Sequence, residues 1–382
     1  MLPPVAPSLP PDRRTVLLGM LGVAGVGVAG CSGGSPRTST TLTTAPSPSP
    51  SPSAAVDTRP RWPLLGTLLK DASAAQHAAV AVKVPDNKNE HPQVGLDKAD
   101  IVFVELDGYP DASGYSSTRL VPVFHSQMPD DVAPVRSIRP VDVPLLSPIG
   151  VIIGNTGASG WVLNYVQRYG RYVEGTLSYL ATRGTGSYSI DPSRVRVYRG
   201  VTYYDRAVVC HPRVLARQTR KFANGPDQVY LPFASTDAEV STASGQDART
   251  IHVPWKKADT YDMGYSYDEA SGRYLRSMPW GAHVLADGTR VATDNVLVIR
   301  ARQYYAKLYP GPGGDEPIHD IIDATGTFDY FHGGRYVTGT WTKAEVNELF
   351  QFTLADGRPL KMAPGQTYVE LPQANAKVRI TA

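Results

Sequence analysis

The sequence has few cysteines, no block of basic residues and no long apolar segment in its main part. Its 382 residues include two cysteines, Cys31 and Cys210, which are too few for a disulfide framework. No group of cysteines and histidines has the spacing of a zinc site, so we expect no metal. The formal net charge is +3 without a basic cluster, which argues against nucleic acid as a partner.

The first 31 residues have the features of an export signal. Arg13 and Arg14 precede an apolar run, residues 16–29, that glycines dilute, and the run leads into Gly30 and Cys31. A basic start, a short apolar core and small residues before a cleavage site are typical of secretory signals, and paired arginines favour the twin-arginine route. We expect cleavage before Cys31, whose thiol would carry palmitate or similar chains.

A membrane-spanning anchor is the alternative interpretation of this segment. The apolar run has 29 − 15 = 14 residues, whereas a hydrocarbon core of about 30 Å takes about 20. We therefore predict a lipoprotein, held on the extracytoplasmic face of the cell membrane through Cys31. Removal of residues 1–30 leaves 382 − 30 = 352 residues, which is enough for two domains of about 100–200 residues.

The remaining chain divides into a linker and two predicted domains. Residues 32–60 are rich in Ser, Thr and Pro, which predicts a disordered linker. From residue 62 on, short apolar runs alternate with helical patterns, which predicts an α/β domain with a mixed sheet over 62–225. The predicted strands are 79–84, 101–106, 120–124 and 151–153, and the predicted helices are 161–169 and 212–222. Pro122 indicates an edge position or a bulge for its strand.

The second half has the pattern of hairpins. Turn dipeptides at 287–288, 333–334 and 356–357 separate strand-like runs, and such pairs are the clearest local sign of a β-hairpin. We therefore predict a mainly antiparallel β domain over 245–382. The whole chain is then of the α+β or mixed α/β class. We expect Cys210, which has no partner if Cys31 is acylated, to be a buried structural thiol.

Several short stretches, taken together, resemble the YerB-like bacterial lipoproteins over about residues 62–380. The matching stretches are 92–96 (PQVGL), 99–102 (ADIV), 134–140 (PVRSIRP), 265–268 (YSYD), 274–276 (YLR), 294–298 (DNVLV), 339–341 (GTW) and 364–368 (PGQTY). The resemblance implies an envelope lipoprotein with two tandem domains of unknown function, and it implies no reaction. The sequence departs from the family pattern in a longer run at 107–119 and around His211, so no active site is carried over there.

Three arginines and a glycine-rich loop form the predicted ligand site. Arg136 and Arg139 are three residues apart, so a helical turn would place them on one face. The loop 154–160 joins a predicted strand to a helix, and the free amides and dipole of a helix N-terminus attract anions. The arginine fork suits carboxylate or phosphate. The residues of this hypothetical anion site are Arg119, Arg136, Arg139, Gly154, Asn155, Thr156, Gly157 and Ser159.

The alternative interpretation is structural: the glycines form a tight turn and the arginines pair with nearby carboxylates. The glycine spacing fits neither a dinucleotide fold nor a nucleoside-triphosphate loop, and no haem, flavin or iron–sulfur motif is present, so we expect no cofactor. The acid–base candidates are Glu105, His125 and Asp142. Ser126 could be a nucleophile but lacks the Gly-x-Ser-x-Gly turn.

Two functional hypotheses remain open at this point. The favoured one is a non-catalytic envelope lipoprotein that binds an anionic wall component or a partner protein, because no complete catalytic set is visible. The alternative is an envelope hydrolase or transferase that acts on phosphate- or carboxylate-bearing wall polymers, with arginines as electrostatic stabilisers. Whether the protein is an enzyme is not decided by the sequence.

Overall fold

The computed structural model describes residues 59–107, 118–204, 206–255 and 261–382. The predicted export signal, the lipidation site Cys31 and all but the end of the predicted linker lie outside these residues. Within the described part, no helix has both the length and the apolar composition that a membrane crossing requires.

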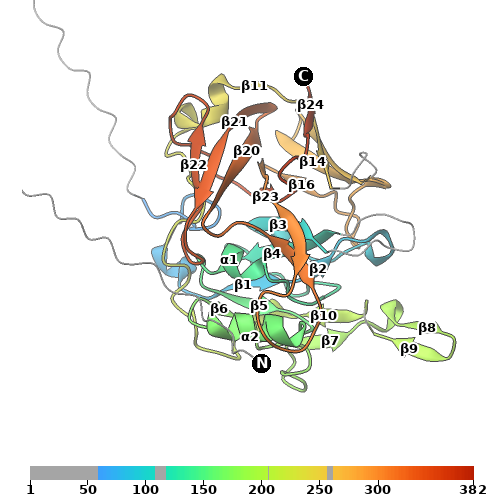
Figure 1. The fold of residues 1–382 in the computed structure, drawn as a ribbon. Helices are drawn as coiled ribbons and strands as arrows, with labels where there is room; N and C mark the ends of the chain where they lie inside the picture. The colour runs from blue at the N-terminus through green and yellow to red at the C-terminus, as the bar shows by residue number, and fades with distance from the viewer. Residues whose placement is uncertain (1–58, 108–117, 205, 256–260) are drawn as a thin grey trace, which may run out of the picture. The chain divides into compact units, whose positions relative to one another are not determined.

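One large mixed sheet runs through both halves of the sequence (Figure 1). Its strands are β1 (Ala79–Val82), β2 (Val84–Pro85), β3 (Ile101–Leu106), β4 (Thr118–Phe124), β5 (Val151–Gly154), β6 (Val173–Glu174), β11 (Gln246–Asp247), β17 (Asn295–Ile299), β20 (Ala324–His332), β21 (Arg335–Lys343), β22 (Gln351–Leu354) and β23 (Thr367–Glu370). Their order is β11-β21-β20-β17-β23-β3-β4-β1-β5-β6, with β2 beside β4 and β22 beside β21.

The two halves meet in this sheet through a parallel pair of strands. β23 pairs with β3, with Thr367 opposite Ile101 and Glu370 opposite Val104, and β17 pairs in parallel with β23 on its other side. Both strands of the second half are buried along their whole length, as strands covered on both faces must be. A single hydrophobic cluster contains residues from both halves, including Phe103 and Trp341.

The first-half strands are confirmed, and Pro122 is accommodated in an unexpected way. β4 is not an edge strand, because it lies between β3 and β1. Its pairing with β1 stops at Val123, opposite Ala81, and its pairing with β2 begins at Leu120, opposite Val84. Pro122 falls in the gap between these pairings, where its missing N–H costs no ladder hydrogen bond. The edge prediction was wrong for this reason.

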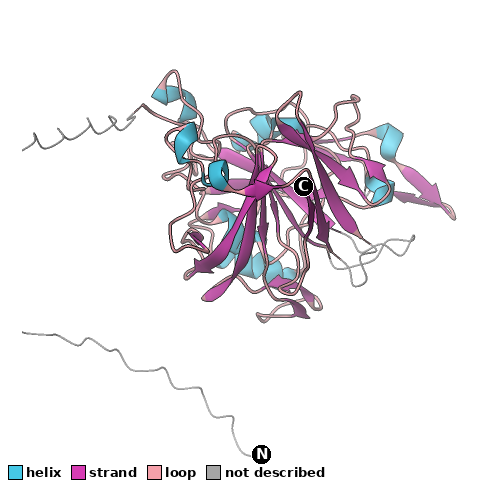
Figure 2. Cartoon of the chain, turned by 90° about the horizontal axis from the view of Figure 1, so that it is seen from above, coloured by secondary structure: helices cyan, strands magenta, loops and turns pink. Residues whose placement is uncertain are grey.

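Helices are few and short (Figure 2). α1 is Asp142–Leu146, α2 is Gly160–Arg168 and α3 is Pro212–Ala216. α2 is the helix predicted at 161–169, and it buries Trp161 and Val162. The helix predicted at 212–222 ends early, at Ala216, because the following residues are polar and offer no apolar face to bury. Phe222 has a φ of +60°, which a helix cannot contain.

A second, antiparallel sheet belongs to the second half of the chain. It consists of β12 (Thr250–Pro254), β13 (Asp262–Asp268), β14 (Arg273–Met278), β15 (Gly281–Ala282), β16 (Ala292–Thr293) and β24 (Arg379–Thr381). The hairpin predicted at 333–334 is confirmed, since β20 and β21 pair antiparallel on either side of it. β18 (Gln303–Ala306) and β19 (Glu316–His319) form a separate pair.

Two small ribbons complete the first half. β7 (Tyr188–Ile190) pairs with β10 (Val208–Cys210), and β8 (Arg196–Tyr198) pairs with β9 (Val201–Tyr203). The β8–β9 hairpin extends away from the large sheet (Figure 1) and its six strand residues are exposed. Cys210, at the end of β10, is buried as predicted.

Candidate functional site

The structure pairs two of the predicted anion-site arginines with one carboxylate. Arg119 Nη2 lies 2.5 Å and Arg139 Nη2 lies 2.7 Å from Asp107 Oδ1. Arg139 also contacts Glu316 at 3.1 Å, and Arg119 donates to the Ser137 carbonyl at 2.7 Å. Burial alone would raise the pKa of Asp107, but the two guanidinium groups outweigh burial and lower it. These arginines therefore already have their anion.

The third arginine lies where the sequence predicts, yet it is also paired. The backbone around Arg136 contacts the glycine-rich loop, since the Thr156 amide donates to the Arg136 carbonyl at 3.0 Å and the Ile138 amide donates to the Gly157 carbonyl at 2.9 Å. The Arg136 guanidinium, however, forms a salt bridge with Glu90. The predicted proximity of loop and arginines exists in the backbone, while the guanidinium groups are committed to carboxylates.

The amides at the start of the loop, those of residues 155–157, are likewise occupied. Gly154 ends β5, and the following Asn155 amide donates to the Tyr188 hydroxyl at 3.0 Å. The Asn155 side chain accepts from the Gly157 amide at 2.8 Å and donates to the Ile153 carbonyl at 2.7 Å. Asn155 is thus a fully buried brace for the turn, which matches the structural alternative.

A segment of the second half covers the N-terminus of α2. Ser159 is at the N-cap position but makes no capping hydrogen bond. Instead, the Trp161 amide donates to the Pro312 carbonyl at 3.0 Å, and the Trp161 indole donates to the Gly314 carbonyl at 2.8 Å. A carbonyl oxygen therefore takes the position that the hypothesis assigned to a ligand anion.

The acid–base candidates Glu105 and Asp142 are joined by a lysine that the sequence analysis did not single out. Lys83 Nζ lies 2.5 Å from Glu105 and 2.6 Å from Asp142, and all three side chains are fully buried. Burial and the nearby Asp142 raise the pKa of Glu105 to about 8 despite Lys83. Asp142 also accepts the Arg139 amide at 2.7 Å. This sealed set holds the ends of β1, β3 and α1 together and leaves no access for a substrate.

The remaining candidate, His125, lies in a large open groove at the other end of these strands, where β1 begins and β4 ends. This strand-edge groove has a volume of about 1040 Å³. Among its lining residues are Trp62, His77, Lys98, His125, Ser126, Asp130, Asp131, Arg213, Arg217 and Lys221. A concave site of this size, with aromatic and charged groups, has the dimensions of a ligand pocket.

Aromatic rings form one wall of the groove. The His77 and His125 rings lie 4.7 Å apart between centroids, and Trp62 meets His125 edge to face at 5.2 Å. Burial, together with His77, lowers the pKa of His125 to about 4, so its ring is neutral at pH 7. Nε2 of His125 donates to the Ala75 carbonyl at 3.0 Å. A ring whose pKa lies this far below 7 is a weak base, and its contacts with Trp62 and His77 are packing contacts.

Ser126 is held in a geometry that does not activate it. Asp100 accepts the amides of His125 at 2.9 Å and Ser126 at 2.8 Å, and it also accepts the Ser126 hydroxyl. Burial raises the pKa of Asp100 to about 6 despite these hydrogen bonds. Since the Ser126 proton points to a carboxylate rather than to an imidazole, these residues fix the turn after β4 and form no nucleophile–base pair.

The charged residues of the groove leave one cation without a partner. Lys98 contacts Asp97 at 2.7 Å, Arg213 contacts Asp130 at 3.5 Å, and Lys221 contacts Glu174. Within the part of the chain that the structure describes, the exposed Arg217 side chain has neither an ion pair nor a hydrogen bond. Arg217 is thus the group in the groove that is ready to receive a carboxylate or phosphate.

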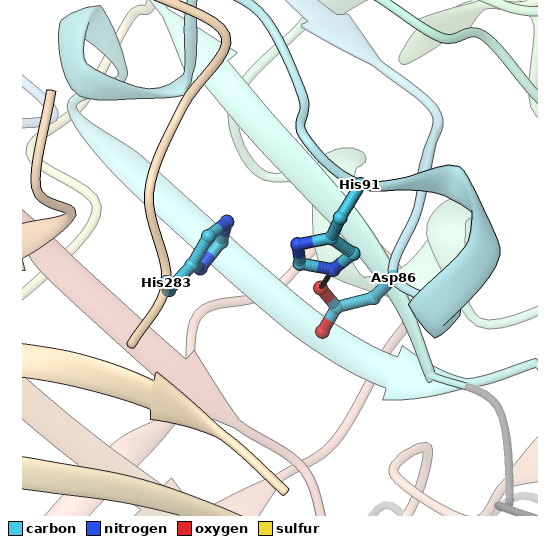
Figure 3. Close-up of side chains that lie close together, drawn as sticks. All are labelled: Asp86, His91 and His283. Carbon is cyan, nitrogen blue, oxygen red and sulfur yellow. Dashed lines mark hydrogen bonds and ion pairs between the residues drawn. The ribbon is translucent and has the colours of Figure 1, made fainter. Parts of the chain in front are cut away.

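Three side chains elsewhere have the geometry that a metal ion could use. Asp86, His91 and His283 offer ligand atoms within 4.8 Å of one another (Figure 3). Two of the three have occupied acceptors: Asp86 accepts from Arg276 at 2.7 Å, and His283 accepts from Arg276 at 2.8 Å. His283 in turn donates to Gln93 at 2.9 Å.

The Arg276 guanidinium argues against a metal ion in this cluster. Burial, reinforced by Arg276, holds the pKa of His283 well below its ordinary value, so the ring is neutral. A divalent cation would lie beside the fully buried guanidinium and would have to displace its hydrogen bonds. Asp86 and His91 come from the first half and Arg276 and His283 from the second, so we interpret the cluster as a polar joint between them.

Comparisons with known proteins agree with this two-part architecture. Two family models match, both described as protein of unknown function (DUF3048): the N-terminal domain at residues 64–206 and the C-terminal domain at residues 251–369. The chain belongs to this family.

A relative from Bacillus subtilis (strain 168), described as "Putative lipoprotein YerB", is 25% identical over 329 residues, which cover 81% of this chain and 85% of the relative. The crystal structure of the YerB protein from Bacillus subtilis aligns with a TM-score of 0.63 at 21% identity, covering 84% of this chain and 100% of that one. The resemblance predicted from short motifs is confirmed, and so is a mixed fold with few helices and many strands.

Proposed function

We propose that this protein is a lipid-anchored envelope protein that binds a wall component through the strand-edge groove. The anchor rests on Cys31 and the export signal before it, and it is supported by the lipoprotein description of the Bacillus subtilis relative. The ligand site of this proposal replaces the Arg119, Arg136 and Arg139 site, because those guanidinium groups are neutralised inside the protein.

The observation that carries the proposal is Arg217, which has no side-chain partner among the described residues and lies in an open groove of about 1040 Å³. Arginine in such a setting binds carboxylate or phosphate bidentately. The Trp62 and His77 rings offer flat apolar faces, and Asp131 offers an acceptor on the rim. A ligand with a carboxylate, hydroxyl or amine groups and an apolar face fits these partners, and wall glycopeptides have this chemistry.

A thermal-shift experiment on the mature chain tests the proposal. The probe is the soluble fraction that muramidase releases from cell walls, added to wild type, Arg217→Ala and Arg220→Ala. Arg220 is the matched control, since it is exposed and belongs to the same segment but does not line the groove. At a ligand concentration about 100 times Kd, binding stabilises the folded state by about 2.7 kcal/mol.

We expect the wild type and Arg220→Ala to be stabilised by the fragments, and Arg217→Ala to lose most of the shift. A stabilisation that survives Arg217→Ala would contradict the proposed contact. Equal losses of the thermal shift in both variants would show that the fragments bind through surface charge in general rather than in the groove.

A further inference from the structure

Three polar side chains, one of which (Asp131) lines the strand-edge groove, form a continuous hydrogen-bonded chain. Nδ1 of His211 lies 2.7 Å from Asp131 Oδ1, and Nε2 of the same ring lies 2.9 Å from Ser189 Oγ. The His211 side chain is 25% exposed and that of Asp131 is 52% exposed, and Ser189 is exposed as well. A substrate in solution can therefore reach the serine.

The backbone fixes all three positions through β10. On one side, β10 pairs with β7, so that Val209 lies opposite Ser189, and the His211 amide donates to the Ser187 carbonyl at 2.9 Å. On its other side, Cys210 and Val132 exchange hydrogen bonds of 2.9 Å in both directions. His211 follows Cys210 directly and Asp131 precedes Val132, so one buried strand end holds the carboxylate and the imidazole together.

The Asp131 carboxylate fixes the position of one ring proton. A carboxylate only accepts, so Nδ1 of His211 carries the proton that it donates to Asp131. In the neutral ring, Nε2 is then the acceptor, and the Ser189 hydroxyl donates to it. This is the tautomer that a general base needs to withdraw a proton from a serine. In Ser126, by contrast, the hydroxyl proton points to Asp100.

We propose that Ser189 is a nucleophile, His211 its general base and Asp131 the positioning residue, in a site that attacks activated acyl and phosphoryl esters. Ser189 Oγ bonds to the carbonyl carbon while its proton passes to His211 Nε2. His211 then protonates the leaving alcohol as the ester C–O bond breaks, which leaves an acyl-serine. Water, deprotonated by His211, releases the acid and restores the serine.

The surroundings supply a cation and a place for the substrate. Arg213 lies two residues after His211, and its guanidinium contacts Asp130, the neighbour of Asp131. Arg213, Asp130 and Asp131 all line the groove. Arg213, whose pair with Asp130 is solvent-exposed, is thus a candidate to stabilise the negative charge that develops on the carbonyl oxygen. The inference extends the proposed function, but it does not depend on Arg217 or on the natural ligand.

A serine-directed fluorophosphonate tests the site in the mature chain. Attack by Ser189 displaces fluoride, so the label marks the reactive hydroxyl, and peptide mapping locates it. The variants are Ser189→Ala, His211→Gln and, as a matched control, Ser193→Ala. Ser193 is an exposed serine whose hydroxyl donates to Asp191 at 2.6 Å, so it is near Ser189 but has no imidazole.

We expect the label on Ser189 in wild type and in Ser193→Ala, and no label there in Ser189→Ala. His211→Gln should slow labelling at least 100-fold. Failure of the folded wild type to react, labelling elsewhere, or an unchanged rate in His211→Gln would each overturn the proposal. The binding of wall fragments is measured separately, so a failure of the labelling experiment can be distinguished from a failure of the proposed function.

Discussion

Replacement of Asp86 by Asn should destabilise the whole fold by several kcal/mol. Asp86 Oδ2 lies 2.7 Å from Arg276 Nη2, and neither side chain is exposed. Asn keeps the shape of Asp but not its charge, so the buried Arg276 loses its ion-pair partner. Removal of one partner from a buried pair costs about 3–5 kcal/mol.

This cost translates into a measurable change in Tm. Residues 55–382 form one unit of 382 − 54 = 328 residues, for which the entropy of unfolding is about 0.7 kcal/mol/K at about 2.1 cal/mol/K per residue. One kcal/mol then corresponds to about 1.5 °C, so we expect Asp86→Asn to lower Tm by about 4–8 °C in differential scanning calorimetry at pH 7.

The matched control is Asp320→Asn. Asp320 pairs with Arg302 at 2.8 Å, but the two side chains are 39% and 66% exposed, and such pairs contribute about 0–1 kcal/mol. Its Tm should change by less than about 1.5 °C. If Asp86→Asn stays within that limit too, the polar joint does not hold the two halves together as described.

The same pair sets a pH dependence with a definite sign. Burial alone would raise the pKa of Asp86, but Arg276 and then His91 outweigh burial and hold it well below its ordinary value of 3.8. The stabilisation is therefore complete above about pH 4 and is lost as pH falls toward the lowered pKa. Asp86→Asn should remove this part of the acid sensitivity.

Two further predictions concern the groove and the buried thiol. Burial lowers the pKa of His125 from 6.5 to about 4, so the stability of the fold is full above pH 6.5 and falls as the pH drops toward 4. His125→Gln should therefore reduce the difference in Tm between pH 7.5 and pH 5. An unchanged difference would contradict the lowered pKa of His125. Burial raises the pKa of the Cys210 thiol well above its usual range. Ellman's reagent should therefore label Cys210 at least 100-fold more slowly in the native than in the urea-unfolded protein. Equal labelling rates in the two states would mean that the native thiol is accessible.

The sequence predicted local elements better than distant pairings. The strand at 101–106 and the helix at 161–169 depend on apolar spacing within one segment, and both are present. The pairing of β23 with β3 joins residues more than 260 positions apart, and no short-range pattern encodes it. The expectation of a mainly antiparallel second half therefore missed the two parallel strands, β17 and β23.

The predicted anion site has partners within the protein that spacing could not reveal. The sequence placed Arg136 next to the loop after β5, and the backbone contacts there exist. The residues that neutralise and cover the site, Glu90, Asp107 and Pro312, come from distant segments. Arginine, glycine and a helix start are visible in a sequence, whereas the groups that already satisfy them are not.

Ser189, His211 and Asp131 lie together in the structure, although no pattern in the sequence predicts it. In the sequence, His211 stood out only as a departure from the family pattern, while Asp131 and Ser189 carried no motif. They meet because β10 is hydrogen-bonded on both sides. Arg217 was likewise inconspicuous, since a free cation differs from a paired one only in its spatial neighbours.

Hydrogen exchange on the mature chain, with and without muramidase-released wall fragments, tests the groove most directly. We predict slower amide exchange in residues 125–131 and 213–221, which contain the groove residues Ser126 and Arg217. Protection confined to residues 136–139 and 154–160, with none in the groove segments, would contradict it and restore the arginine loop as the binding site.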